Sequence, residues 1–259
     1  MKSIASGVLF FLLLFHLPYF SFAWGAKGHH IVAEVAFHYL DDSTKARVLR
    51  DLGKMSIEEA STWMDDMREN SFYDYMKPWH YINIEKGQTY KPVATDRNIL
   101  IILNSAMHDI NHRDSVKQKQ LQEDLYYLFH LIGDFHQPLH DGYGVDRGGN
   151  DINVSFRFKT YGTNLHKVWD FEIIDANSIT IDSVLALYPS YSAQDITNIQ
   201  TINLTKWLNE SRSYLDEVYN FKDNFIDQAY VDKNAVFIEK QLLFAGLRLA
   251  AILKAAYGS

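Results

Sequence analysis

The sequence predicts a single, mainly α-helical domain that contains one small β-hairpin. Most of the chain repeats apolar residues at the three- and four-residue spacing of an amphipathic helix. Residues 141–164 break this pattern, and within them the segment INVSFRF alternates as a strand does. The chain has 259 residues and shows no repeat, low-complexity tract or linker, so one domain is the simplest organisation.

The expected helices follow one another along the chain, each with an apolar face. They are expected at residues 29–40, 41–53, 56–70, 94–112, 118–133, 164–176, 203–218 and 236–258. The second has Asp42 or Ser43 as its N-cap and ends at Gly53, because Asp and Ser accept backbone N–H groups and glycine ends helices readily. The third opens with Ser56 and Glu59, the spacing of a capping box.

The first 23 residues have the features of a signal peptide. Lys2 precedes the apolar run 8–15, and Ser21 and Ala23 are the small residues that precede a cleavage site. The run is too short to span a bilayer comfortably, and no later stretch approaches the necessary length. We therefore expect a signal peptide at 1–23 and a mature domain at 24–259. The protein would then be secreted or periplasmic, without stable membrane association after cleavage; an uncleaved anchor is the alternative.

Composition restricts the function. The chain contains no cysteine, which excludes a disulfide scaffold and thiolate metal ligands. Its formal net charge is −7, whereas modules that bind nucleic acid non-specifically are usually basic. An acidic chain argues against such a module. It leaves open an enzyme whose positive charge is supplied by metal ions.

Histidine and aspartate recur at a spacing suited to metal binding. The stretch FHLIGDFHQPLH places His130 four residues before Asp134 and continues to His140. The stretch NLHKVWD repeats the spacing with His166 and Asp170. On a helix, residues four apart share a face, so each pair can hold one ion.

A single pair of this kind is usually a packed histidine and a solvated carboxylate. Two pairs make that interpretation weaker, and His130 and Asp134 lie among apolar residues, where an unpaired carboxylate is costly. Imidazole together with carboxylate suits zinc. Asp65 and His80 are further candidate ligands.

Six short motifs occur in order along the chain. They are Trp-Gly-x-x-Gly-His at 24–29, Trp-x-Asp at 63–65, His-Tyr-Ile-Asn at 80–83, His-x-x-Gly-Asp-x-x-Gln-Pro-x-His at 130–140, Gly-Gly-Asn at 148–150 and Asn-Leu-His-x-x-x-Asp at 164–170. Together they resemble the trinuclear-zinc single-strand-specific nuclease family: fungal single-strand nucleases, plant bifunctional nucleases and bacterial relatives, in one superfamily with the zinc phospholipases C. The resemblance covers the whole mature chain and implies the helical fold of that superfamily.

The resemblance implies three zinc ions and their ligands. Carried onto this sequence, the first ion is held by Asp65, His80, His130 and Asp134. The second is held by His29, by Asp134 as a bridge, and by the α-amino and carbonyl groups of Trp24 as the first residue of the mature chain. The third is held by His140, His166 and Asp170. An α-amino group has a pKa of roughly 7.7–8.0, so it can release its proton to a metal near neutral pH. His30 and His136 receive no ligand role.

The resemblance also implies substrate contacts. Asp65, Arg68 and Asp134 are the expected catalytic residues, with Arg68 stabilising transition-state charge; its alternative is a solvated helix residue. Tyr81 is expected to stack on a base, or else to be a core aromatic. Asn150 is expected to contact substrate. Asn83 replaces an aspartate common in fungal and plant members, so the base preference is open.

The expected function is therefore zinc-dependent hydrolysis of phosphodiesters in single-stranded RNA and DNA, giving 5′-phosphorylated products. A 3′-nucleotidase activity is expected as well, and the protein is expected to be a monomer. The alternatives are a zinc phospholipase C-type hydrolase of lipid head groups and a non-catalytic zinc-binding protein. The five-residue distance from Trp24 to His29 argues against the phospholipases, which place that histidine further on.

Overall fold

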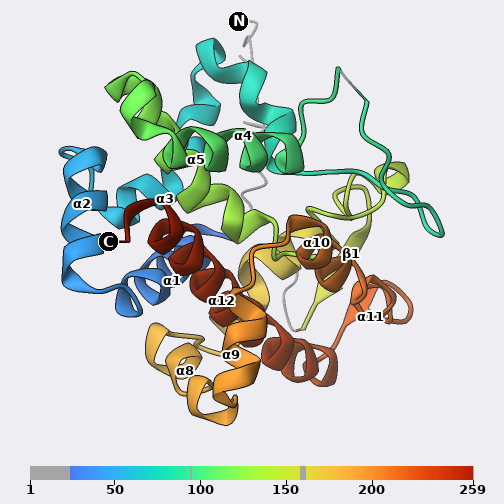
Figure 1. Cartoon of the computed structure of the whole chain (residues 1–259). Coiled ribbons are helices and arrows are strands. Elements are labelled where there is room, and N and C mark those ends of the chain that lie inside the picture. The colour runs from blue at the N-terminus through green and yellow to red at the C-terminus, as the bar shows by residue number, and fades with distance from the viewer. Residues whose placement is uncertain (1–23, 94, 158–161, 259) are drawn as a thin grey trace, which may run out of the picture.

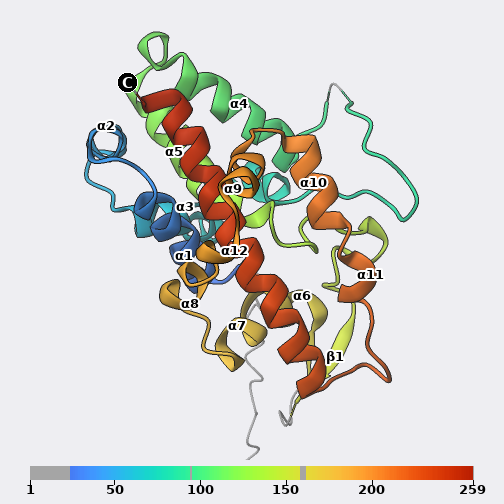
Figure 2. The same cartoon turned by 60° about the horizontal axis from the view of Figure 1, so that its bottom comes forward.

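The computed structural model describes residues 24–93, 95–157 and 162–258, so the expected signal peptide lies outside the described residues (Figure 1). The molecule is mainly helical, as predicted, with one small sheet. Its central element is α12 (Gln228–Tyr257), which runs the length of the molecule (Figure 2). The helices α1 (Ala26–His38), α5 (Gln118–Asp134), α7 (Ile173–Ala176), α8 (Ile181–Leu185) and α9 (Ala193–Gln200) pack against it.

The helices α1 and α12 pack closely against each other. Gly246 of α12 lies against Val35 of α1, and a Cβ at position 246 would lie 2.3 Å from Val35 Cγ1. A side chain there would push the two helices apart. The site depends on this packing because α1 carries His29. None of the helices in the described part of the chain is both long and apolar enough to cross a membrane.

The first three helices of the amino-terminal half begin within three residues of their expected positions. The bounds are α2 (Asp42–Leu52), α3 (Ile57–Asp66) and α4 (Ile99–Asn111), with 3₁₀ segments η1 (Met67–Glu69), η2 (Ser71–His80) and η3 (Arg113–Ser115). The capping box of Ser56 and Glu59 is confirmed. The N-cap predicted for α2 was wrong: the cap is Asp41, whose carboxylate accepts from Thr44 N–H at 2.9 Å. The predicted start of α4 at 94 was also wrong, because Asn98 caps the helix.

The carboxyl-terminal half is more broken than expected. The helix predicted at 164–176 consists of α6 (Leu165–Lys167), a π-helical segment η5 (Val168–Glu172) and α7. The helix predicted at 203–218 divides into α10 (Leu204–Arg212) and α11 (Leu215–Val218). The helices α8 and α9 and the segments η4 (Gly144–Asp146) and η6 (Tyr188–Ser190) were not predicted. Asp227 caps α12, which therefore starts before the predicted residue 236.

The predicted hairpin is part of a three-stranded sheet with the order β2-β1-β3. Strand β1 (Asn153–Phe156) pairs antiparallel with β2 (Thr163–Asn164), with Val154 opposite Thr163. Strand β3 (Phe225–Ile226) adds to β1 in parallel and was not predicted. The sheet leads directly into α6, so it fixes the chain on which His166 lies.

Candidate metal centre and active site

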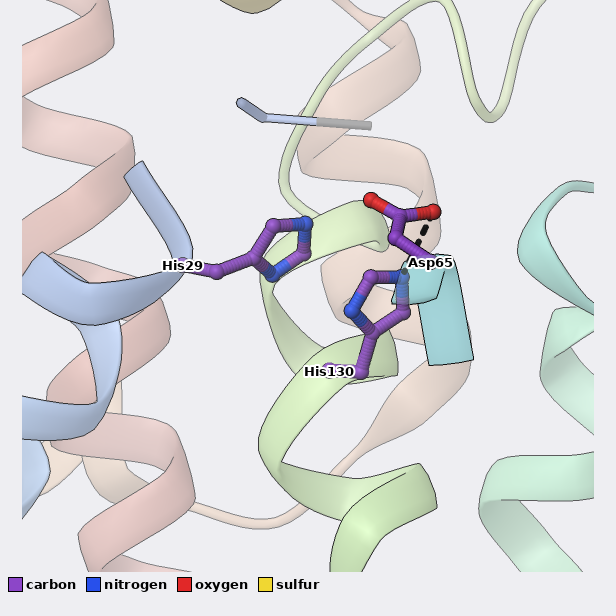
Figure 3. A group of neighbouring side chains, drawn as sticks. All are labelled: His29, Asp65 and His130. Atoms are coloured by element: carbon purple, nitrogen blue, oxygen red, sulfur yellow. Dashed lines mark ion pairs between the residues drawn. The ribbon is translucent and has the colours of Figure 1, made fainter. Parts of the chain in front are cut away.

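Three helices bring His29, Asp65 and His130 together. The side chains come from α1, α3 and α5 and point toward one another (Figure 3). The rings of His29 and His130 stack with their centroids 4.0 Å apart, and His130 Nε2 lies 3.7 Å from Asp65 Oδ1. All three side chains are buried. Stacked imidazoles beside a carboxylate place several ligand atoms within reach of one cation.

Small residues create the space for this arrangement. A Cβ at Gly133 would lie 2.8 Å from His29 Nδ1, so the glycine allows the imidazole to lie against α5. A Cβ at Gly28 would lie 2.7 Å from the Cβ of Trp24, whose side chain is buried beside the site. The N–H of Gly25 donates to the carbonyl of Asp170 at 2.9 Å. The chain at Trp24 is therefore fixed next to both candidate ligand clusters.

Asp134 lies at the centre of the first cluster. Its Oδ1 lies 3.2 Å from His29 Nε2. Its Oδ2 lies 3.0 Å from His80 Nδ1 and 3.3 Å from His130 Nε2. One carboxylate oxygen thus faces His29 and the other faces His80 and His130. This geometry suits a carboxylate that bridges two cations.

The second cluster contains His140, His166 and Asp170. The i to i+4 spacing suggested the pair of His166 and Asp170, and the family resemblance added His140. His166 Nε2 lies 3.4 Å from Asp170 Oδ2, and His140 Nε2 lies 4.0 Å from Asp170 Oδ1. Gln137 donates to Asp170 Oδ1 at 2.8 Å and accepts from the N–H of Leu139 at 2.6 Å. The amide of Gln137 therefore holds the carboxylate of Asp170 in position.

The positions of the protons on His140 and His166 leave their Nε2 atoms free to bind a cation. His140 Nδ1 and His166 Nδ1 each lie 2.6 Å from a backbone carbonyl, of His80 and Gly148 respectively. A carbonyl only accepts, so each Nδ1 carries the proton and each neutral ring presents a bare Nε2. These two Nε2 atoms face each other at 3.2 Å with no proton between them. A metal ion ligated by both resolves this contact.

Burial and charge shift the acid–base behaviour of the ligands. Burial lowers the pKa of both His29 and His166 to about 3, which keeps these imidazoles neutral and able to bind metal. Burial raises the pKa of Asp170 well above its usual value and that of Asp65 to about 6. Uncompensated carboxylates at such depth are costly, and bound cations would remove that cost.

His130 and Asp134 behave differently because they are charged partners. Burial alone would lower the pKa of His130, but the negative charges of Asp134 and Asp65 raise it to about 9. Burial alone would raise the pKa of Asp134, but nearby His130 and His140 hold it well below its usual value. In the metal-free protein a proton on His130 thus compensates Asp134, and a metal would replace that proton.

A cavity of about 440 Å³ opens over the two clusters. Its lining includes the ligand candidates His80, His140 and His166. It also includes four of the six residues expected to be catalytic or to contact substrate: Arg68, Tyr81, Asn83 and Asn150. Arg68 Nε lies 3.1 Å from Asp65 Oδ1, which directs the guanidinium to the cluster. Tyr81 is 40% exposed, so its ring is open to a ligand and is not a core aromatic. Asn150 Nδ2 donates to the carbonyl of Arg147 at 2.9 Å.

Comparison with known proteins decides the family. The model of the S1/P1 nuclease family matches residues 24–258. The chain belongs to the S1/P1 nucleases. Among its relatives, endonuclease 4 of Arabidopsis thaliana is 28% identical over 96% of this chain and 94% of the relative. Nuclease P1 of Penicillium citrinum is 29% identical over 91% of this chain and 98% of the relative. Nuclease S1 of Aspergillus oryzae is 25% identical over 92% of this chain and 93% of the relative.

This S1/P1 nuclease also contains residues near the site that the sequence analysis did not single out. Gln137, Lys77 and Arg147 are among them, and so is Arg248 of α12. The buried Arg248 donates to His136 Nε2 at 2.8 Å, while His136 Nδ1 donates to the carbonyl of Ile132 at 2.7 Å. His136 is thus saturated by protein partners and belongs to the support of the turn between Asp134 and His140. The spacing of Gln137 within the motif was the available signal; Arg248 gave none, because it lies on a distant helix.

Proposed function

We propose that this S1/P1 nuclease uses three zinc ions to hydrolyse phosphodiesters of single-stranded RNA and DNA. The expected products carry a 5′-phosphate, and 3′-nucleotides are a second substrate. The observation that carries the proposal is the bare pair of Nε2 atoms of His140 and His166, 3.2 Å apart beside Asp170, next to a carboxylate of Asp134 shared by three imidazoles. Neutral imidazoles with carboxylates are a ligand set suited to zinc.

The metal ions and the protein residues would have separate roles in the reaction. Bound zinc supplies Lewis acidity and a nucleophile formed from water near neutral pH. Arg68, held by Asp65, stabilises the charge that develops on phosphate oxygens. Tyr81 stacks on an unpaired base. Stacking accepts any base, and the need for an unpaired base favours single strands. Asn83 and Asn150 contact the nucleotide from the cavity wall.

The proposal includes the maturation of the chain. Export and cleavage between Ala23 and Trp24 would free the amine of Trp24, which would join His29 and Asp134 as a ligand. The buried position of Trp24 beside both clusters supports this role. The mature enzyme would be a monomer outside the cytoplasm.

A direct experiment tests the activity. The processed chain, 24–259, is purified and incubated with single-stranded and duplex oligonucleotides, with a 3′-mononucleotide and with phosphatidylcholine. Expected are cleavage of the single strands, 5′-phosphates on the fragments by mass spectrometry, loss of activity with a chelator and recovery with zinc. Hydrolysis of phosphatidylcholine in place of oligonucleotides would overturn the proposal in favour of a lipid head-group hydrolase. Absence of both activities from a zinc-loaded protein would point to a zinc-binding protein.

A further inference from the structure

The charge of the cavity differs from that of the whole chain. The chain has a formal net charge of −7. The described residues that line the cavity nevertheless include three cations, Arg68, Lys77 and Arg147, and no carboxylate. Arg68 contacts Asp65 and so belongs to the metal centre. Lys77 and Arg147 contact neither ligand cluster through any ion pair or hydrogen bond of their described side chains, and the mechanism above does not use them.

Lys77 and Arg147 both present available charges. The Nζ of Lys77 lies 2.6 Å from Asp74 Oδ1, and Nη1 of Arg147 lies 3.4 Å from Asp151 Oδ1. The side chains of Lys77 and Arg147 are 55% and 74% exposed. Exposed ion pairs of this kind contribute little to stability, so a phosphate can replace the carboxylate partner at small cost.

The backbone beneath Arg147 is anchored. Arg147 adopts the left-handed conformation with φ 54°, and its carbonyl accepts from the side chain of Asn150. The preceding Asp146 accepts from the N–H of Gly149 at 3.0 Å and from the hydroxyl of Tyr219 at 2.7 Å. An exposed guanidinium thus projects from a fixed loop in the wall of the cavity. Lys77 projects from η2, the segment that ends at His80.

We propose that Lys77 and Arg147 bind phosphates that flank the scissile phosphate, and thereby favour polynucleotides over substrates with a single phosphate. The inference rests on the proposed nuclease function. Arg147 can form two parallel hydrogen bonds to one phosphate, whereas Lys77 acts as a point charge. Both contacts are independent of sequence, since every nucleotide carries the same phosphate.

The test compares two substrates of one enzyme. A dinucleoside monophosphate contains a scissile phosphodiester and no flanking phosphate. An eight-nucleotide single strand contains a scissile phosphodiester and flanking phosphates. The variants are Lys77→Gln, Arg147→Gln and the double variant, with Arg147→Lys as the charge-conserving form. Lys119→Gln is the matched control. Lys119 is an exposed lysine paired with Glu123 at 3.8 Å, and it lies about 16 Å along α5 from His130.

The measured quantity is the ratio of kcat/KM for the octanucleotide to that for the dinucleoside monophosphate. Each glutamine substitution is expected to lower this ratio roughly five-fold, and the double variant more, because an exposed charge contact contributes up to about a factor of five. The log–log dependence of octanucleotide binding on salt should also become shallower by about 0.7 per lost contact. Lys119→Gln should keep the wild-type ratio, and Arg147→Lys most of it.

The outcomes separate this inference from the proposed function. A wild-type enzyme that cleaves neither substrate contradicts the nuclease function itself. If the wild type cleaves both substrates and the glutamine variants keep its ratio, the flanking-phosphate role is overturned. The same conclusion follows if a substitution lowers kcat/KM by the same factor for both substrates. That result places Lys77 and Arg147 at the scissile phosphate or in the support of the fold.

Discussion

Asp134→Asn is the substitution that tests the centre of the site most directly. Asparagine fills the same space, so the packing of α5 is retained, but the side chain loses its charge and one of its two acceptor oxygens. The structure directs Oδ1 to His29 and Oδ2 to His80 and His130. One substitution should therefore weaken two metal sites together and leave the cluster of His140, His166 and Asp170 in place.

The size of the effect follows from these contacts. Replacing groups that only orient a ligand costs 10- to 100-fold in metal affinity, so losing a charged ligand should cost at least about 100-fold at each of two ions. Because both ions of the pair are affected, activity should fall by at least about 100-fold. In the metal-free protein the charge of Asp134 helps to raise the pKa of His130 to about 9. Loss of the Asp134 charge should lower the free energy of unfolding of the metal-free protein by about 2–3 kcal/mol.

The pH dependence of that loss has a definite sign. The pKa of His130 is higher in the folded than in the unfolded chain, so the stabilisation is fully present below about pH 6.5 and is lost as the pH rises through about 9. Metal-free Asp134→Asn should thus differ most from metal-free wild type near pH 6. Denaturant unfolding at pH 6 and pH 9.5 measures this difference.

The metal assay gives the decisive result. Elemental analysis of the dialysed protein should find three zinc ions per chain in the wild type and about one in Asp134→Asn. Asp66→Asn is the control, since Asp66 is the exposed neighbour of Asp65 and its carboxylate accepts from the hydroxyl of Thr62 at 3.2 Å. Three tightly bound ions in Asp134→Asn would refute the bridging role of Asp134.

Three further outcomes are expected. A chelator should lower the Tm of the mature chain and zinc should restore it, because metal binding removes the cost of burying Asp65 and Asp170; an unchanged Tm in differential scanning calorimetry would count against the metal centre. One extra residue before Trp24 should reduce zinc content and turnover, since an amide is a poor ligand; an extended protein as active as the processed one would eliminate the amine role. Asp124→Asn should stabilise the protein by about 1–2 kcal/mol at pH 8 and little at pH 4. Burial raises the pKa of Asp124 to about 7, so the native state loses stability as the pH rises from about 4 to 7; equal shifts in Tm at both pH values would contradict this reasoning.

The fold was predictable where local signals agree with tertiary structure. Capping by Ser56 and the apolar stripe of α5 specify their helices locally, and both helices begin within one residue of the expected position. The helix capped by Ser56 ends at Asp66, before the predicted residue 70. The segment 164–176 was predicted as one helix, because apolar spacing does not reveal a change to π-helical hydrogen bonding at Val168. Strand β3 contains only Phe225 and Ile226 and forms by pairing with a distant strand, so two residues offered no pattern to detect.

The candidate site was predictable to a different degree. The spacing of His130 and Asp134 on one helix indicated their proximity, and the structure does place them together. The approach of His29 and His80 to this pair depends on packing between elements, and only the family resemblance suggested it. Lys77 and Arg147 were not predicted, since a surface lysine and a surface arginine acquire a common role only when the chain folds over one cavity.

The hydrogen bonds that hold the imidazoles have a consequence for the divergence of the family. His130, His140 and His166 each donate to a backbone carbonyl, of Ser61, His80 and Gly148. A carbonyl is present whatever side chain the residue carries, so positions such as 61 can change without disturbing the ring that they orient. At position 61, selection on the supporting contact therefore acts on the path of the chain and leaves the amino-acid identity free to drift. Homologues that share only 25–29% of their residues with this chain can keep the same orientation of their histidines without any matching side chain at such positions.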